Sequence, residues 1–203
     1  AVTIALPTFS ALYVFGDSLS DSGNNNLRFG GNTGPAPVSG TFIPSLPYAA
    51  SPVGAYRPTY GNGPTWVTSF AAGLGLSAFS APSLAGGGNY AYGGARMTVD
   101  GTGAPPFVPP PFPASVQTQL NSYLSTRPVS STALYVIAGG GNDVRAVGEA
   151  VAANPANAVA LTTAGATAFA TAAAQMVGTL RASGASNIVV WNTPDVGKSP
   201  AAG

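Results

Sequence analysis

Three short apolar runs constrain the fold of this chain more than any other feature. They are ALYVF at residues 11–15, ALYVIA at 133–138 and NIVVW at 187–191, and each is followed at once by residues such as Gly, Asp, Asn or Pro. Their apolar character is continuous rather than alternating, which is typical of strands buried on both faces of a parallel sheet. The chain is therefore predicted to be an α/β protein with helices covering a parallel sheet.

The segments between the runs supply the helices that such a sheet requires. Residues 157–186 are rich in Ala, which favours helix, and Gly184 is well placed to end it. A strand, this helix and the next strand make a βαβ unit. Two further helices are expected at residues 64–75 and 115–125, where apolar side chains recur every four residues. Two stretches rich in Gly, Pro and Ser are expected to be long loops: 30–54 and 100–115.

Composition excludes several classes of function. A length of 203 residues suits one domain, and a single domain over residues 1–203 is expected. The net charge is only +1 and no basic cluster occurs, so nucleic-acid binding is disfavoured. The absence of cysteine and histidine argues against a disulfide framework and against a metal site, and no cofactor is expected. The chain begins at Ala1, so we expect a secretory signal to have been removed.

Polar residues with chemical potential follow the first two runs. In an open parallel sheet, ligands bind outside the carboxyl ends of the strands, where these turns meet. Gly-Asp-Ser follows the first run at residues 16–18, and Gly-Gly-Gly-Asn-Asp follows the second at 139–143. Taken alone, Ser18 is better explained as the cap of a following helix, and Asn142 as an ordinary turn residue.

A third segment changes this interpretation. GGGNYAYGGARM at residues 86–97 places Gly93 and Gly94 where backbone can approach a ligand without an intervening side chain. A serine hydroxyl, a glycine N–H and an asparagine amide are the groups needed to attack a carbonyl carbon and to stabilise the oxyanion that forms. Together the three segments indicate acyl-transfer chemistry.

The same segments resemble a known family. FGDSLSDSGN at residues 15–24 resembles the first block of the GDSL, or SGNH, family of serine esterases and lipases, NYAYGGA at 89–95 its second block, and GGGND its third. All three occur in the family's order with compatible separations, which is more specific than any one of them. The chain is most similar to bacterial secreted and autotransporter-passenger esterases. The resemblance implies a flavodoxin-like three-layer α/β/α fold and a secreted or cell-surface location.

Position by position, the resemblance implies roles for particular residues. Ser18 would be the nucleophile, and its own N–H, the N–H of Gly94 and the side-chain amide of Asn142 would stabilise the oxyanion. Gly93 is the alternative donor if the match is shifted by one residue. Three acidic residues would shape the turns behind these groups: Asp17, Asp21 and Asp143. Asp143 fits a plain helix cap equally well.

The family's remaining block, an Asp-x-x-His turn that supplies the general base, is missing. The sequence has no histidine, and Asp195 is a poor substitute because an exposed carboxyl group has a pKa of about 4. We therefore expect the chain to be the N-terminal portion of a larger esterase, cut before that turn, with a sheet incomplete on its C-terminal side. The remainder would be lost or present as a separate chain. Alone, the chain is expected to be inactive or nearly so.

The expected reaction is hydrolysis of a carboxylic ester, in a small molecule or a lipid, through an acyl-enzyme on Ser18. Aromatic residues in and near the loops would suit an acyl or aryl ester, or would simply cover the core: Phe42, Tyr48, Tyr56, Tyr60 and Phe107. Two alternatives stay open. One is deacetylation of a carbohydrate, which the same family includes, and the other is a non-catalytic surface module that kept the fold.

Overall fold

A parallel sheet of three strands lies at the centre of the computed structural model. The strands are β1 (Leu12–Gly16), β2 (Leu134–Ala138) and β3 (Asn187–Val190), in the spatial order β1-β2-β3. Their ends lie within one residue of the three predicted runs, and both pairs of neighbouring strands are parallel. The structure describes the following residues: 8–28, 59–60, 63–103, 109–193 and 195.

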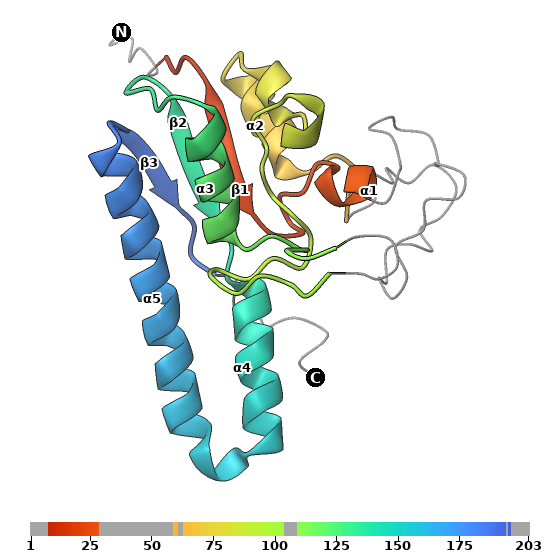
Figure 1. The fold of residues 1–203 in the computed structure, drawn as a ribbon, viewed down its shortest axis with the longest axis vertical. Coiled ribbons are helices and arrows are strands. Elements are labelled where there is room, and N and C mark those ends of the chain that lie inside the picture. Colours follow the sequence, from red (N-terminus) through yellow and green to blue (C-terminus); the bar gives the residue numbers. More distant parts are fainter. Residues whose placement is uncertain (1–7, 29–58, 61–62, 104–108, 194, 196–203) are drawn as a thin grey trace, which may run out of the picture.

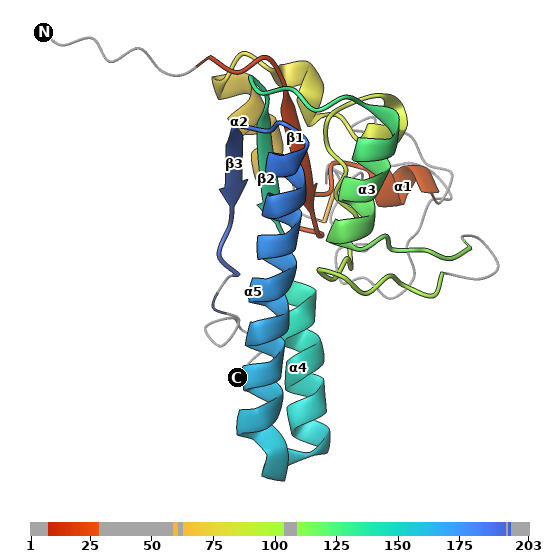
Figure 2. The same cartoon turned by 60° about the vertical axis from the view of Figure 1, so that its left-hand side comes forward.

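Helices cover both faces of this sheet, as Figures 1 and 2 show. Helices α3 (Val116–Thr126) and α5 (Ala158–Ala182) lie on one face, and α2 (Trp66–Gly73) lies on the other. Since side chains alternate along a strand, Phe15 packs toward α3 and α5 while Val14 packs toward α2. The predicted three-layer α/β/α fold is confirmed.

The connection between β2 and β3 contains two helices, whereas the sequence predicted one. Helix α4 (Gly141–Ala153) follows β2 directly, and a short 3-10 turn at Pro155–Asn157 leads into α5. No helix was predicted for the residues of α4. None of the residues of α4 is fully buried, although Val144, Val147 and Val151 recur at helical spacing. The two helices form a hairpin that extends beyond the carboxyl edge of the sheet (Figures 1 and 2).

An extended segment at residues 88–92 lies along the edge of β1. The N–H of Val14 donates to the carbonyl of Gly88 at 3.0 Å, and the N–H of Tyr90 donates to the carbonyl of Val14 at 2.8 Å. This pairing continues to the end of β1. It brings the following residue, Gly93, to the turn that carries Ser18.

The two Pro-rich loops are described only in part. Residues 30–54 lie outside the described ranges, as do four of the five aromatic residues discussed above: Phe42, Tyr48, Tyr56 and Phe107. At the ends of the second loop, the N–H of Phe112 donates to the carbonyl of Gly101 at 3.2 Å. Among the helices placed in the structure, none is long and apolar enough to cross a membrane.

Candidate active site

Ser18 lies in a tight turn directly after β1. The carbonyl of Asp17 accepts hydrogen bonds from the N–H groups of Ser20 and Asp21, both at 3.0 Å, and these bonds close the turn. Ser18 is partly exposed, whereas Asp17, Ser20 and Asp21 are buried. The turn therefore leaves Ser18 partly accessible to solvent at the carboxyl end of a buried strand.

The alternative in which Ser18 caps the following helix is wrong. Helix α1 (Asn24–Arg28) begins well after the turn. Asp21 caps it instead, because its Oδ1 accepts the N–H groups of Gly23 and Asn24, both at 2.8 Å. The hydroxyl of Ser18 is therefore not needed for capping.

Asp21 also connects the Ser18 turn to the glycine segment. Its Oδ2 accepts the N–H of Gly93 at 2.9 Å and the N–H of Asn25 at 3.3 Å. Burial raises the pKa of Asp21 to about 6, while the four backbone donors around it favour the ionised form. A buried carboxylate thus holds together two segments that are distant in sequence.

Asp21 is predicted to titrate near pH 6 in the folded chain. Its folded pKa of about 6 exceeds the ordinary Asp value of about 3.9, so the folded state binds more protons between these values. The contribution of Asp21 to stability therefore falls from about pH 4 to about pH 6, by at most about 1.4 kcal/mol per pH unit, and then levels off. The ¹³Cγ shift of Asp21 followed by NMR measures the pKa directly. A midpoint below pH 4.5 would contradict this prediction.

The structure distinguishes the two glycines of the second segment. The N–H of Gly93 is already donated to Asp21, and a Cβ at Gly93 would lie 2.1 Å from the ring of Tyr60. Gly94 is exposed, has a φ of +84°, and no acceptor for its N–H is found within the described ranges. Gly94 therefore has the N–H that a ligand can use, and the unshifted match to the family block is favoured.

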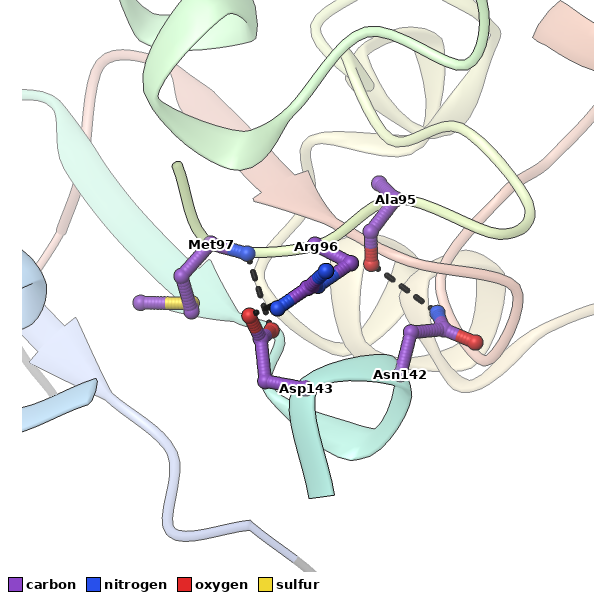
Figure 3. Close-up of polar contacts among 5 residues, drawn as sticks. All are labelled: Ala95, Arg96, Met97, Asn142 and Asp143. Carbon is purple, nitrogen blue, oxygen red and sulfur yellow. Dashed lines mark hydrogen bonds and ion pairs between the residues drawn. The ribbon is translucent and has the colours of Figure 1, made fainter. Parts of the chain in front are cut away.

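Asn142 lies in the first turn of α4, beside the glycine segment. Its Nδ2 donates to the carbonyl of Ala95 at 2.9 Å (Figure 3). A side-chain amide carries two N–H groups, so the second can be donated to a ligand. The bond orients the amide next to the residue that follows Gly94.

Asp143 binds the same segment rather than the N–H groups of its own helix. Its Oδ2 accepts the N–H of Met97 at 2.9 Å, and its Oδ1 lies 3.3 Å from Nε of Arg96 (Figure 3). Together Asn142 and Asp143 fasten the start of α4 to residues 95–97. This geometry favours the role that the resemblance implies for Asp143 over a plain cap.

Asp17 connects the Ser18 turn to the start of α4. Burial raises its pKa, the N–H groups of Leu19 and Gly141 oppose this rise by hydrogen bonding, and the nearby carboxylate of Asp143 adds to it. Its Oδ1 accepts the N–H of Leu19 at 3.1 Å. The carboxyl group therefore lies between the two turns that carry Ser18 and Asn142.

Gln119 supports the site although its role could not be read from the sequence. It is 1% exposed, its Oε1 accepts the N–H of Gly16 at 2.8 Å, and its Nε2 donates to the carbonyls of Gly16 and Ala114, both at 2.9 Å. These bonds fix the last residue of β1 just before Ser18. The only signal in the sequence is a polar side chain beside Leu120 on the buried face of the helix.

Asp195 occupies a different position along the sheet edge. It is exposed and follows β3, and β2 separates that strand from β1. The turns of Ser18, Gly94 and Asn142, in contrast, are joined by the hydrogen bonds given above. In the ranges that the structure covers, no group of three or more His, Cys, Asp or Glu residues could hold a metal ion.

Comparison with known proteins places this arrangement in a family. Residues 12–202 match the family model described as GDSL-like Lipase/Acylhydrolase. A comparison with curated proteins gave no match. The family match covers all three segments and all three strands of the sheet. Since it extends over most of the sequence, the chain belongs to the GDSL-like lipase and acylhydrolase family.

Proposed function

We propose that this chain carries the nucleophile and the oxyanion donors of a serine carboxylic-ester hydrolase. Oγ of Ser18 attacks the ester carbonyl carbon, and the alcohol leaves as the acyl-enzyme forms. The N–H groups of Ser18 and Gly94 and the side-chain amide of Asn142 stabilise the oxyanion. The observation that carries the proposal is the hydrogen bond from the N–H of Gly93 to Asp21. Because Gly93 is engaged in this way, Gly94 is the glycine beside the Ser18 turn whose N–H can bind a ligand.

The general base must come from outside these residues. A proton leaves the hydroxyl of Ser18 during attack, and the sequence has no histidine to accept it. We propose that a histidine elsewhere in the same protein, or on a separate chain, fills this role. In another serine hydrolase, loss of the catalytic histidine costs on the order of 10⁶ in turnover.

The chain alone is therefore expected to hydrolyse p-nitrophenyl acetate only at a residual rate. When the base is missing, the oxyanion donors and substrate binding still leave a rate enhancement of about 10³–10⁴-fold over the reaction in water. Spectrophotometric turnover of the purified chain tests this, with Ser18→Ala as the background. Turnover of hundreds per second by the unmodified chain would contradict the requirement for an external base.

A fluorophosphonate probe tests the identity of the nucleophile. In imidazole buffer, which supplies a diffusible base, we expect peptide mass spectrometry to find the label on Ser18. Ser18→Ala should remain unlabelled, while Ser22→Ala should label normally, because the Oγ of Ser22 is buried and has no partner among the residues described. Absence of label on Ser18 would instead favour a non-catalytic module, the alternative that the missing histidine supports.

A further inference from the structure

A large cavity lies beside the β1 edge of the sheet, which is the edge opposite β3. Its volume is about 770 Å³, within the range of roughly 300–1,000 Å³ for small-molecule sites. Its walls come from α1, the 3-10 turn at Ser83–Ala85, the edge segment at residues 88–92 and α3. Figures 1 and 2 both place α1 beyond β1. We call this cavity the side groove, and its lining includes these residues: Arg28, Tyr90, Tyr92, Ser122, Thr126 and Arg127.

The charged residues that line the side groove are both basic. Arg28 comes from the last turn of α1, and Arg127 directly follows α3. None of the six acidic residues of the chain lines the groove. The two ion pairs found within the described ranges use Arg96 and Arg145 instead. The groove therefore carries positive charge that no carboxylate in its walls balances, which favours an anionic ligand.

One carboxylate lies next to the wall without entering the lining. Oδ2 of Asp100 accepts a hydrogen bond from Oγ1 of Thr118 at 3.0 Å, and Oδ1 accepts the N–H of Ser115 at 2.7 Å. Asp100 is exposed, so water and salt screen its charge. The anionic groups of a ligand therefore belong at the two arginines rather than at the Thr118 end of the wall.

Both arginines are held by contacts with aromatic rings and backbone. Arg127 lies over the ring of Tyr13, 5.9 Å from its centroid, and its Nη2 donates to the carbonyl of Gly86 at 3.0 Å. Burial raises the pKa of Tyr92, and hydrogen bonding to Arg28 opposes this rise. A guanidinium group carries five N–H groups, more than these contacts use. The contacts therefore orient the two side chains without using all of their donors.

The two arginines lie at different positions along β1. Arg127 is over Tyr13, whereas Arg28 contacts Tyr92, whose N–H donates to the carbonyl of Gly16 at 3.2 Å. Tyr13 and Gly16 are three residues apart in β1, which corresponds to roughly 10 Å in a strand. A ligand with two separated anionic groups therefore suits the groove better than a single small anion.

The α3 wall of the groove is rich in hydroxyl groups. Thr118, Ser122 and Thr126 recur every four residues and so share one face of the helix. Oγ1 of Thr126 donates to the carbonyl of Ser122 at 2.8 Å and can still accept a hydrogen bond. Leu84, which is 46% exposed, and Pro111 add apolar surface for the C–H groups of a sugar ring. This mixture suits a hydroxylated ligand better than a fatty acid.

We propose that the side groove binds an acidic saccharide, with its negative groups at Arg28 and Arg127 and its hydroxyl groups along α3. The negative groups are carboxylates or phosphates, because a guanidinium group binds both through paired N–H donors. Binding in the groove requires no chemistry at Ser18. It is therefore separate from the function proposed above, and Ser18→Ala should bind the saccharide as tightly as the unmodified chain.

Isothermal titration calorimetry of the chain tests the side groove with two probes. One is a disaccharide of two glucuronate units and the other is a hexose bisphosphate, so the tighter of the two distinguishes carboxylate from phosphate. We expect saturable binding of at least one probe, weakened by added salt because exposed charges are screened. The neutral glucose disaccharide of the same linkage should not bind, and inorganic phosphate should bind more weakly than the tighter probe.

Arginine variants locate the binding. Arg28→Gln and Arg127→Gln should each weaken binding of the tighter probe by about tenfold, the usual scale for loss of a hydrogen bond to a charged group. Arg181→Gln is the matched control, because it removes the same charge from an exposed residue outside the lining. Its affinity should equal that of the unmodified chain.

A second pair of variants keeps the test decisive if Arg127→Gln disturbs the fold. Ser122→Leu narrows the groove and should weaken the same binding to a similar extent, whereas Ser125→Leu, exposed on the same helix and outside the lining, should not. Failure of both probes to bind would overturn the proposal, as would equal affinities in the lining and control variants. Inorganic phosphate or the neutral disaccharide binding as tightly as the probes would overturn the acidic saccharide as the ligand.

Discussion

Replacing Gln119 by leucine is expected to lower the free energy of unfolding by roughly 2–6 kcal/mol, since each buried polar group left without a partner costs about 1–3 kcal/mol. Two groups lose their partner, the N–H of Gly16 and the carbonyl of Ala114, whereas the carbonyl of Gly16 keeps the N–H of Tyr92 at 3.2 Å. Leucine is close to glutamine in size, so the loss arises mainly from hydrogen bonding. Such a loss is a large part of the 5–15 kcal/mol that is typical of a domain.

Urea unfolding of the two proteins measures this difference. Gln117→Leu is the matched control, because Gln117 lies on the same helix and is partly exposed. A surface change of this kind usually alters stability by no more than about 0.5 kcal/mol. If the two variants were equally stable, Gln119 would not be fixing the end of β1 as the contacts indicate.

Asn142→Ala is expected to slow acylation of Ser18 by about 10²–10³, the usual cost of removing one oxyanion donor. The variant loses the amide that points toward the glycine segment while the backbone of α4 stays intact. The rate of acetylation by p-nitrophenyl acetate at a fixed imidazole concentration is the measurement, and far-UV circular dichroism checks the fold.

Asn154→Ala provides the comparison for this prediction. Asn154 is exposed at the other end of α4, far along the helix from the Ser18 turn, and its loss should leave the acylation rate unchanged. A rate for Asn142→Ala within threefold of that for Asn154→Ala would remove Asn142 from the oxyanion site.

The strands and the longest helix could be predicted from the sequence because their signals are local. A strand buried on both faces is apolar throughout, as in residues 133–138, and all five residues of β2 are buried. Helix α5 ends just before Gly184, whose φ of +103° is the left-handed conformation that glycine adopts readily. Helix α4 was missed, although valines recur in it at helical spacing, because Gly141 and Gly148 lower the helix propensity of this segment.

The supporting contacts of the site could not be predicted, because they join residues that are distant in sequence. Asp21 accepts the N–H of Gly93, and Gln119 binds Gly16, across long stretches of intervening chain. The residues next to Asp21 and Gln119 in the sequence look the same as those around an Asp in an exposed turn or a Gln on an exposed helix face. No local pattern therefore marks these two side chains as buried supports of the site. The roles of Ser18 and Asn142 came from the resemblance to the family, since each residue alone fits ordinary turn chemistry.

The central claim is that Ser18 is a nucleophile whose oxyanion donors lie in this chain and whose base does not. The most direct test is to measure the rate at which p-nitrophenyl acetate acetylates Ser18, by mass spectrometry, as the imidazole concentration increases. We expect a slow rate without imidazole, a rise with its concentration, and no acetylated turn peptide in Ser18→Ala. Acetylation that is equally fast without imidazole, or that falls on another residue, would contradict the claim.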